Sequence, residues 1–153
     1  MDNSDYVQDN EELYRSVRGK LENKEYSIQK GELIIEPAAF QDRYKQPSVD
    51  RAKLIDYNPV LSQKSETDGI VSIRAGEVRA IGTVKTRISN ENVDDHAVDV
   101  VPDPTSENPA HAKIIVKPEF WGSNNKQKNA FKLLRIALAK LATKNGWIIE
   151  PTS

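Results

Sequence analysis

Apolar and polar residues alternate along much of the middle of this chain, which is the pattern of half-buried β-strands. Each such segment is short and is bounded by Gly, Pro, Asn or Asp. The segment 26–35 is predicted to be a hairpin that turns at Lys30-Gly31, where a glycine is free to take a positive φ. The other strands are predicted at 70–74, 83–88, 96–101, 111–116 and 147–149, with a short turn or helix over 75–81.

The pattern changes near the C-terminus, where the segment 124–145 has the period of a long helix. Ala and Leu are frequent there, and Gly146 stands where a helix commonly ends. Its apolar stripe consists of Ala130, Phe131, Leu134, Ala137, Leu138 and Leu141, broadened by Leu133 and Ile136. We therefore expect one face of this helix to pack against the sheet.

A second, shorter helix is predicted near the N-terminus, over 9–26. Leu13, Tyr14, Val17 and Leu21 fall on one face at helical spacing, and Asp9 or Asn10 can cap the first turn. Residues 1–8 before it have the composition of a flexible tail.

Two short helical pieces are predicted over 37–55, separated by Pro47, with Ser48 as the N-cap of the second. The segment 56–69 that follows is polar and irregular, and it contains the turn dipeptides Asn58-Pro59 and Asp68-Gly69. We expect it to be a mobile loop.

Together these patterns predict an α+β fold in a single domain of residues 9–153. It has a mainly antiparallel sheet of about five to seven strands, the C-terminal helix packed on one face, and the shorter N-terminal helix docked nearby. The alternative is a sheet rolled toward a small barrel, with the helix plugging one side.

The composition narrows the chemistry. The chain has 153 residues, 37% hydrophobic and 29% charged, which suits one domain with a modest core. It has no cysteine, which excludes disulfides, iron–sulfur clusters, thiolate zinc sites and a cysteine nucleophile. Two histidines are too few for a multi-histidine metal site, so we expect no metal and no cofactor.

The first residues of the sequence lack the pattern of a signal peptide, and no apolar run is long enough to span a bilayer. We therefore expect a cytoplasmic protein without membrane contact.

Charges are distributed unevenly. Residues 89–112 carry six acids and no Lys or Arg, whereas residues 126–144 carry six bases and no acid. Asp94, Asp95 and Asp99 do not fit the spacing of a calcium loop, and we interpret them as solvated. The basic helix, with Lys132 and Arg135, is interpreted as an ordinary surface helix. The alternatives are that it binds nucleic acid, or a protein partner or an anionic membrane surface.

The histidines open two segments, 96–101 and 111–116, that are expected to pair as antiparallel strands. His96 and His111 then lie at opposite ends of the pair, roughly 16 Å apart, which excludes a histidine dyad. We interpret His96 as structural. His111 is expected near Val101 and Asp103, where a carboxylate could orient it as a base; the simpler interpretation is that it caps the loop through backbone groups.

Two further groups of polar residues are candidates for anion contacts. Arg15 and Arg18 are expected to share one helix edge, and Ser48, Asp50 and Arg51 lie at a predicted helix start. No defined motif joins them, and salt bridges or helix caps explain them equally well.

Three functions stay open. The first is a small soluble binding or adaptor domain that acts through contacts with an unidentified protein partner. The second is a small enzyme that acts on a nucleotide or nucleic acid, with His111, Arg15, Ser48 and Asp50 as catalytic candidates and Arg18 and Arg51 as binding candidates. The third is nucleic-acid binding through Lys132 and Arg135 of the basic helix.

Overall fold

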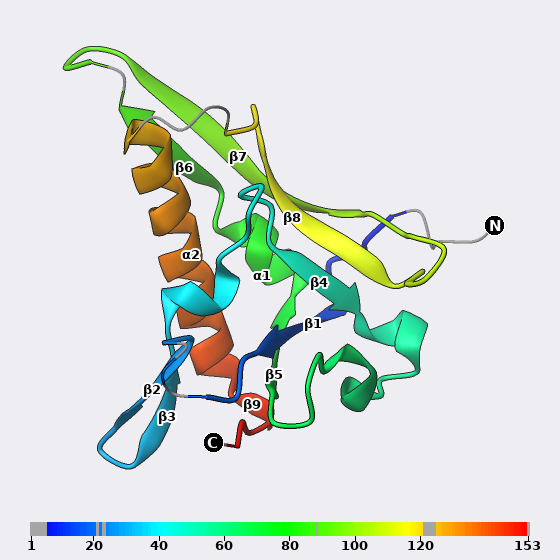
Figure 1. Cartoon of the computed structure of the whole chain (residues 1–153). Coiled ribbons are helices and arrows are strands. Elements are labelled where there is room, and N and C mark those ends of the chain that lie inside the picture. The colour runs from blue at the N-terminus through cyan, green and yellow to red at the C-terminus, as the bar shows by residue number, and fades with distance from the viewer. Residues whose placement is uncertain (1–5, 21, 23, 88, 121–124, 153) are drawn as a thin grey trace.

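Seven strands form one antiparallel sheet in the computed structural model, which describes residues 6–20, 22, 24–87, 89–120 and 125–152 (Figure 1). The strands of this sheet are β1 (Glu12–Val17), β4 (Ser48–Arg51), β5 (Gly69–Arg74), β6 (Thr83–Arg87), β7 (Val93–Pro102), β8 (His111–Lys117) and β9 (Trp147–Ile149). Their order across the sheet is β6-β7-β8-β4-β1-β5-β9, and each neighbouring pair is antiparallel. Among the described strands β6 and β9 are the two edges, so the sheet is open rather than closed into a barrel.

The remaining elements lie around this sheet. A separate hairpin, β2 (Tyr26–Gln29) with β3 (Glu32–Ile35), turns at Lys30-Gly31 as predicted, and both turn residues have positive φ. The helices are α1 (Ala75–Ala80) and α2 (Asn125–Asn145). The described part of the chain also contains the 3-10 turns η3 (Pro37–Phe40), η4 (Ala52–Ile55) and η5 (Pro59–Ser62).

Helix α2 covers one face of the sheet (Figure 1). The side chains of Phe131, Leu134 and Leu138 are buried in the main core with strand residues such as Leu13 and Ile114. The predicted stripe is therefore the packing face, although Leu133 is 53% exposed and does not broaden it. Because side chains alternate along a strand, the other face of β1, β4 and β8 points away from this helix. It carries polar residues such as Ser16, Ser48 and Asp50, together with the buried Tyr14, which packs in a second, smaller core cluster.

The predicted N-terminal helix is wrong, because residues 12–17 form β1, a central strand between β4 and β5. An apolar pair four residues apart, such as Leu13 and Val17, fits one face of a helix and also one face of a strand, since four is even. Both side chains are fully buried against the α2 side of the sheet. Leu21, which completed the helical pattern, lies outside the described residues.

The predicted helix after Pro47 is also wrong, because Ser48 begins the strand β4 instead of capping a helix. Val49 and Arg51 point to the buried side and alternate with Ser48 and Asp50, and the strand is held by partners on both sides. The helical turn that follows is the short η4.

Of the predicted tail, residues 1–5 lie outside the described residues, and residues 6–8 are packed. Val7 is fully buried in the main core, and the backbone oxygen of Tyr6 accepts a hydrogen bond from Arg51. The packed part of the chain therefore begins before residue 9.

Candidate functional site

The main sheet divides between β1 and β4. These strands pair only at Leu13↔Arg51 and Tyr14↔Asp50. Beyond that point β1 continues to pair with β5, as far as Val17, and β4 continues to pair with β8. The two strands thus separate, and we call this opening the fork.

Arg15 fills the fork. Its Nη1 donates to the backbone oxygen and the hydroxyl of Ser48 on the other strand, at 2.8 and 3.2 Å. Its Nε and Nη2 donate to the backbone oxygens of Ala39 and Gln41, each at 2.9 Å. The guanidinium is therefore held by groups from two segments of the chain, β4 and the stretch of η3 with its C-terminal cap. Of its five N–H groups, one on Nη2 is left over by these bonds.

The charge of Arg15 is fixed in place without a carboxylate against it. No ion pair joins Arg15 to any acid in the described part of the chain, and Glu25 and Asp42 act on it only from a distance. Burial lowers the pKa of Arg15, because the charged form loses hydration, and the two acids raise it in part. A guanidinium pKa remains far above neutral pH, so the fork holds a permanent positive charge.

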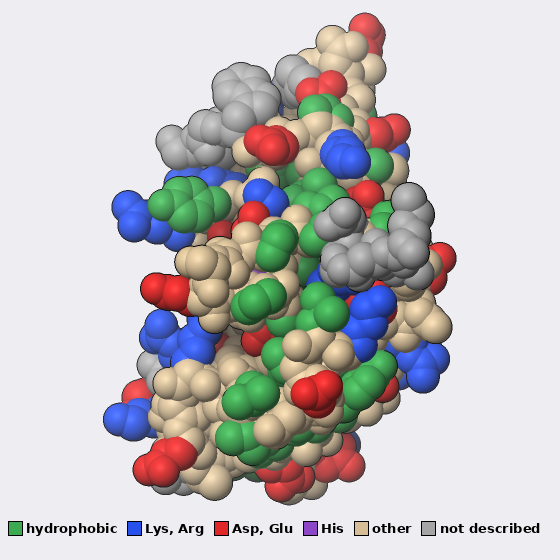
Figure 2. All heavy atoms as spheres, turned by 90° about the vertical axis from the view of Figure 1, so that its right-hand side faces the viewer, with side chains coloured by type: hydrophobic (Ala, Val, Ile, Leu, Met, Phe, Trp, Pro, Cys, Tyr) green, Lys and Arg blue, Asp and Glu red, His purple; other side chains and the backbone are tan. Residues whose placement is uncertain are grey.

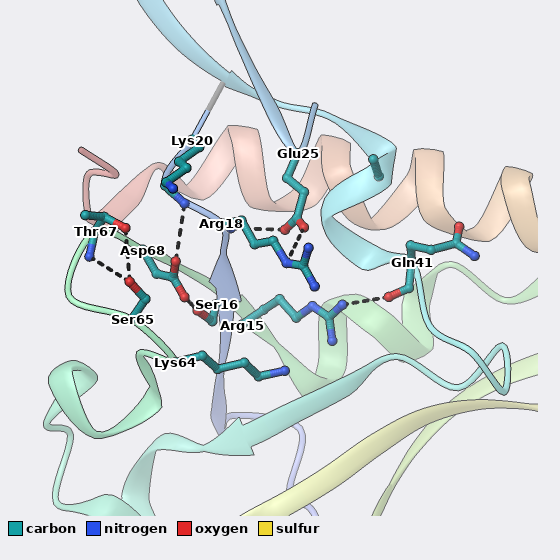
Figure 3. A pocket seen from close by; sticks show the side chains of 12 residues that line it. Arg15, Ser16, Arg18, Lys20, Glu25, Gln41, Lys64, Ser65, Thr67 and Asp68 are labelled. Atoms are coloured by element: carbon teal, nitrogen blue, oxygen red, sulfur yellow. Dashed lines mark hydrogen bonds and ion pairs between the residues drawn. The ribbon is translucent and has the colours of Figure 1, made fainter. Parts of the chain in front are cut away.

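A cavity of about 700 Å³ opens on this charge. It is lined by four basic residues, two acidic residues and several small polar ones (Figure 3). The basic residues are Arg15, Arg18, Lys20 and Lys64. Figure 3 shows the side chains of Arg18, Arg15 and Lys64 projecting in the same direction, with Lys64 coming from the segment after η5. The cavity therefore concentrates positive charge.

The two acids of the larger cavity are already bound by hydrogen bonds or an ion pair to other residues of the chain. Asp68 is buried and accepts from the Ser16 hydroxyl at 2.8 Å and from the Gly19 amide at 3.3 Å. Glu25 accepts from the Arg18 amide and lies 3.4 Å from Arg18 Nε. Burial raises the pKa of Glu25 and outweighs the opposing effect of Arg18 and Arg15.

A smaller cavity of about 260 Å³ adjoins the larger one, since Arg15, Ser16 and Lys64 line both. Its other polar lining comes from Tyr14, Ser48, Asp50, Ser62, Gln63, Asn108 and His111. Asp50 is held by two donors, the Ser62 hydroxyl at 2.7 Å and the Asn108 amide at 2.8 Å. The carboxylate is thus fixed in one orientation at the wall of the cavity.

His111 is oriented by Asp103, near which the sequence placed it. Its Nδ1 lies 3.0 Å from the backbone oxygen of Asp103 and 3.2 Å from the carboxylate Oδ2. Both partners are acceptors, so Nδ1 carries the hydrogen. The other ring nitrogen, Nε2, has no partner among the described residues, and His111 lines the smaller cavity.

The structure brings together five of the predicted site residues. Arg15, Ser48, Asp50 and His111 line the smaller cavity, and Arg18 lines the larger one. Arg15 and Arg18 do so from a strand and the residues after it, not from a helix edge.

Three other candidates lie apart from these cavities. Arg51 is 1% exposed and forms an ion pair with Glu11. Lys132 and Arg135 are on α2, where the Arg135 guanidinium lies 4.9 Å from the centre of the Phe131 ring.

Sequence reasoning missed Lys64, Asn108, Glu25 and Asp68. Asn108-Pro109 and Asp68-Gly69 are visible as turn signals, but a turn does not say which strands it will meet. Lys64 carries no signal of its own in an irregular polar segment. These residues enter the site only through the pairing of distant strands.

His96 is buried on the α2 side of the sheet, far from the fork in the strand order. Its Nδ1 lies 2.7 Å from the backbone oxygen of Pro118 and its Nε2 lies 2.8 Å from the Thr86 hydroxyl, and its ring is packed against Phe120. His96 and His111 are at opposite ends of the β7–β8 pair, as the antiparallel pairing predicts.

Within the described residues no group of three or more His, Cys, Asp or Glu side chains is arranged to hold a metal ion. A search of the same residues finds no helix with the length and apolar character of a membrane span. Comparisons of this chain with protein-family models, with curated proteins and with solved structures found no match.

Proposed function

We propose that this protein binds a small ligand carrying a phosphate ester in the two cavities at the fork. The observation that carries the proposal is the guanidinium of Arg15, which is fixed by three backbone oxygens and has no carboxylate in contact within the described residues. A charge held in this way is preorganised for an anion, because little side-chain freedom remains to be lost on binding.

The surroundings of Arg15 support an anion of more than one charge. Arg18, directly after β1, and Lys64, from the segment after η5, project beside it, and Arg18 is 70% exposed, so its side chain is accessible to a ligand. Hydrogen bonds between charged groups contribute about 1.5–3 kcal/mol each. Phosphate, with several acceptor oxygens, can use all three cations at once.

The size and polarity of the cavities support a ligand larger than phosphate alone. The larger cavity, about 700 Å³, is within the range of small-molecule sites. The smaller one offers fixed hydrogen-bonding groups, Asp50, Asn108 and several hydroxyls, suited to the polar body of a nucleotide or sugar phosphate.

The test is calorimetric titration of the purified protein with inorganic phosphate, AMP and ribose 5-phosphate. We expect binding of at least one phosphate ester, weakened tenfold or more by Arg18→Gln together with Lys64→Gln. These side chains are exposed, so the fold should survive the change. Lys132→Gln, on the exposed face of α2, is the matched control and should leave the affinity unchanged. The proposal fails if no probe binds at millimolar concentration, or if the double variant Arg18→Gln with Lys64→Gln binds like the wild type.

A second candidate is the predicted protein-binding role, which one observation favours. Leu54, Tyr57, Val60 and Leu61 are all exposed, on and between η4 and η5. These turns lie on the right-hand side of the molecule in Figure 1. Figure 2 views the molecule from that side and shows hydrophobic side chains at several points on this face. If this patch binds a protein, Val60→Asp with Leu61→Asp should lose a partner captured by the wild type, and Lys132→Gln should retain it.

A further inference from the structure

We infer that the fork site is a reaction centre in which His111 acts as the general base for hydrolysis of the bound phosphate ester. This inference rests on the proposed function, because the ester must first bind at Arg15. The observation that points to it is a histidine with a fixed tautomer in the same cavity as two of the cations.

The strand order places His111 within reach of one ligand with Arg15. In the register, His111 on β8 is opposite Asp50 on β4, and Asp50 is opposite Tyr14 on β1, so these three share one face of the sheet. Arg15 starts from the other face of β1, and its Nη1 reaches the Ser48 hydroxyl at the fork, where Arg15 lines the smaller cavity. Neighbouring strands lie about 4.8 Å apart, so His111 and Tyr14 are separated by about 10 Å of sheet. Arg15, Lys64 and His111 all line the smaller cavity.

The contacts of the ring decide which nitrogen reacts. The backbone oxygen and the carboxylate of Asp103 both accept the hydrogen bond of the Nδ1–H group. The lone pair of the neutral imidazole is therefore on Nε2. The carboxylate also stabilises the imidazolium that forms when Nε2 accepts a proton, as an acid behind a catalytic histidine does in general. Asp103 is thus a positioning residue.

The charged groups on the elements around His111 do not oppose this role. Asp50 faces it from β4 but is held by Ser62 and Asn108. Arg15 and Lys64, from β1 and the segment after η5, line the same cavity as His111. Their charges stabilise the negative charge that builds up on the non-bridging phosphate oxygens in the transition state.

The reaction balances without a co-reactant other than water. The oxygen of a water molecule attacks phosphorus while Nε2 of His111 takes one of its protons. The bond between phosphorus and the ester oxygen breaks, and the leaving alkoxide takes a proton from bulk water. The imidazolium then releases its proton to solvent, which restores the neutral ring and leaves a phosphate and an alcohol.

The test uses the full chain and follows phosphorus NMR with AMP, ribose 5-phosphate, a dinucleotide and bis(p-nitrophenyl) phosphate. We expect hydrolysis of at least one of these. His111→Gln should lower kcat by a hundredfold or more, since a general base contributes about 10²–10⁴-fold. Lys113→Gln, two residues along the same strand and outside both cavities, should keep the wild-type rate.

Asp103→Asn separates positioning from simple structural support. The backbone oxygen of residue 103 still holds Nδ1, so the ring keeps its tautomer, but the charge behind it is gone. The value of kcat should therefore fall while the KM for the ester stays unchanged, which loss of folding alone would not produce.

The outcomes distinguish the two proposals. If a phosphate ester binds in calorimetry and none of the four probes is hydrolysed, or if His111→Gln retains the wild-type rate, the inference of catalysis is overturned and the binding proposal stands. If no ester binds, the proposed function itself fails and the inference fails with it.

Discussion

Arg51 and Glu11, forty residues apart in the chain, form a buried ion pair with two hydrogen bonds, Nε to Oε1 at 2.8 Å and Nη2 to Oε2 at 2.9 Å. Their side chains are only 1% and 3% exposed. Arg51 also donates to the backbone oxygen of Tyr6, and Lys53 lies 3.4 Å from Glu11. The pair therefore ties the segment before β1 to the end of β4, on the side of the fork where the strands remain paired.

Glu11→Gln should lower the free energy of unfolding by about 3 kcal/mol, because removing one member of a buried pair leaves the other charge without compensation. Urea denaturation followed by circular dichroism measures the change. Glu32→Gln, at an exposed position of β3, is the control and should change stability by less than about 0.5 kcal/mol. Equal stability of the two variants would show that the pair contributes nothing.

The same pair predicts how stability depends on pH. Burial raises the pKa of Glu11, but hydrogen bonds from Arg51 and the Gln8 amide, with the charges of Arg51 and Lys53, lower it more, so the net pKa lies below its ordinary value of 4.5. A lowered pKa in the folded state means that the contribution is fully present above the unfolded value and is lost as the pH falls through the folded value.

Unfolding free energies measured between pH 6 and pH 3 should therefore decline for the wild type and decline less steeply for Glu11→Gln. Other carboxylates, such as Asp99 beside Arg79, have lowered pKa values and contribute to both curves, so the difference between the curves isolates Glu11. Parallel curves would contradict the role assigned to this residue.

Gly19→Ala should destabilise the protein by a few kcal/mol, because there is no room for a side chain. A Cβ at this position would lie 2.0 Å from the backbone oxygen of Thr67 and 2.7 Å from that of Thr152. Backbone must move to relieve such contacts, and forcing atoms into a packed site costs typically 1–3 kcal/mol or more. Thermal unfolding measures the effect.

Gly31→Ala is the comparison for that prediction. Gly31 has a φ of +81° but nothing within 4 Å of its Cβ position, so its cost comes only from backbone conformation. That cost is about 1 kcal/mol. If Gly31→Ala is the more harmful change, the close approach at Gly19 is not a constraint.

Nucleic-acid binding through α2 remains a prediction. The Arg135 side chain is half-buried over Phe131, and burial lowers the pKa of its guanidinium, so Lys132 is the more accessible of the two cations. If the helix binds a phosphate backbone, affinity for a duplex should fall steeply between 50 and 200 mM salt, and Lys132→Glu with Arg135→Glu should abolish it. Fluorescence anisotropy measures both effects, and undetectable or salt-insensitive binding would remove this function.

The local pattern of the sequence was enough to predict the elements whose signal is unambiguous. The hairpin, the strands β5 to β9 and the long helix α2 all follow from periodicity and from glycine and proline positions, although β7 begins at Val93, three residues before its predicted start. The antiparallel pairing of β7 with β8 followed from their short connection, and with it the contact between His111 and Asp103. A mainly antiparallel sheet with a C-terminal helix packed on it was therefore within reach of sequence reasoning.

What only the tertiary structure decided is the identity of β1 and β4, and with them the fork. Leu13 and Val17 have a spacing that helix and strand share, and the segment 48–51 is too short for its period to decide. Each becomes a strand because partners on both sides satisfy its backbone hydrogen bonds, and those partners come from distant parts of the chain. The grouping of Arg15, Lys64 and His111 depends on the same long-range pairing, which no local pattern of residues encodes.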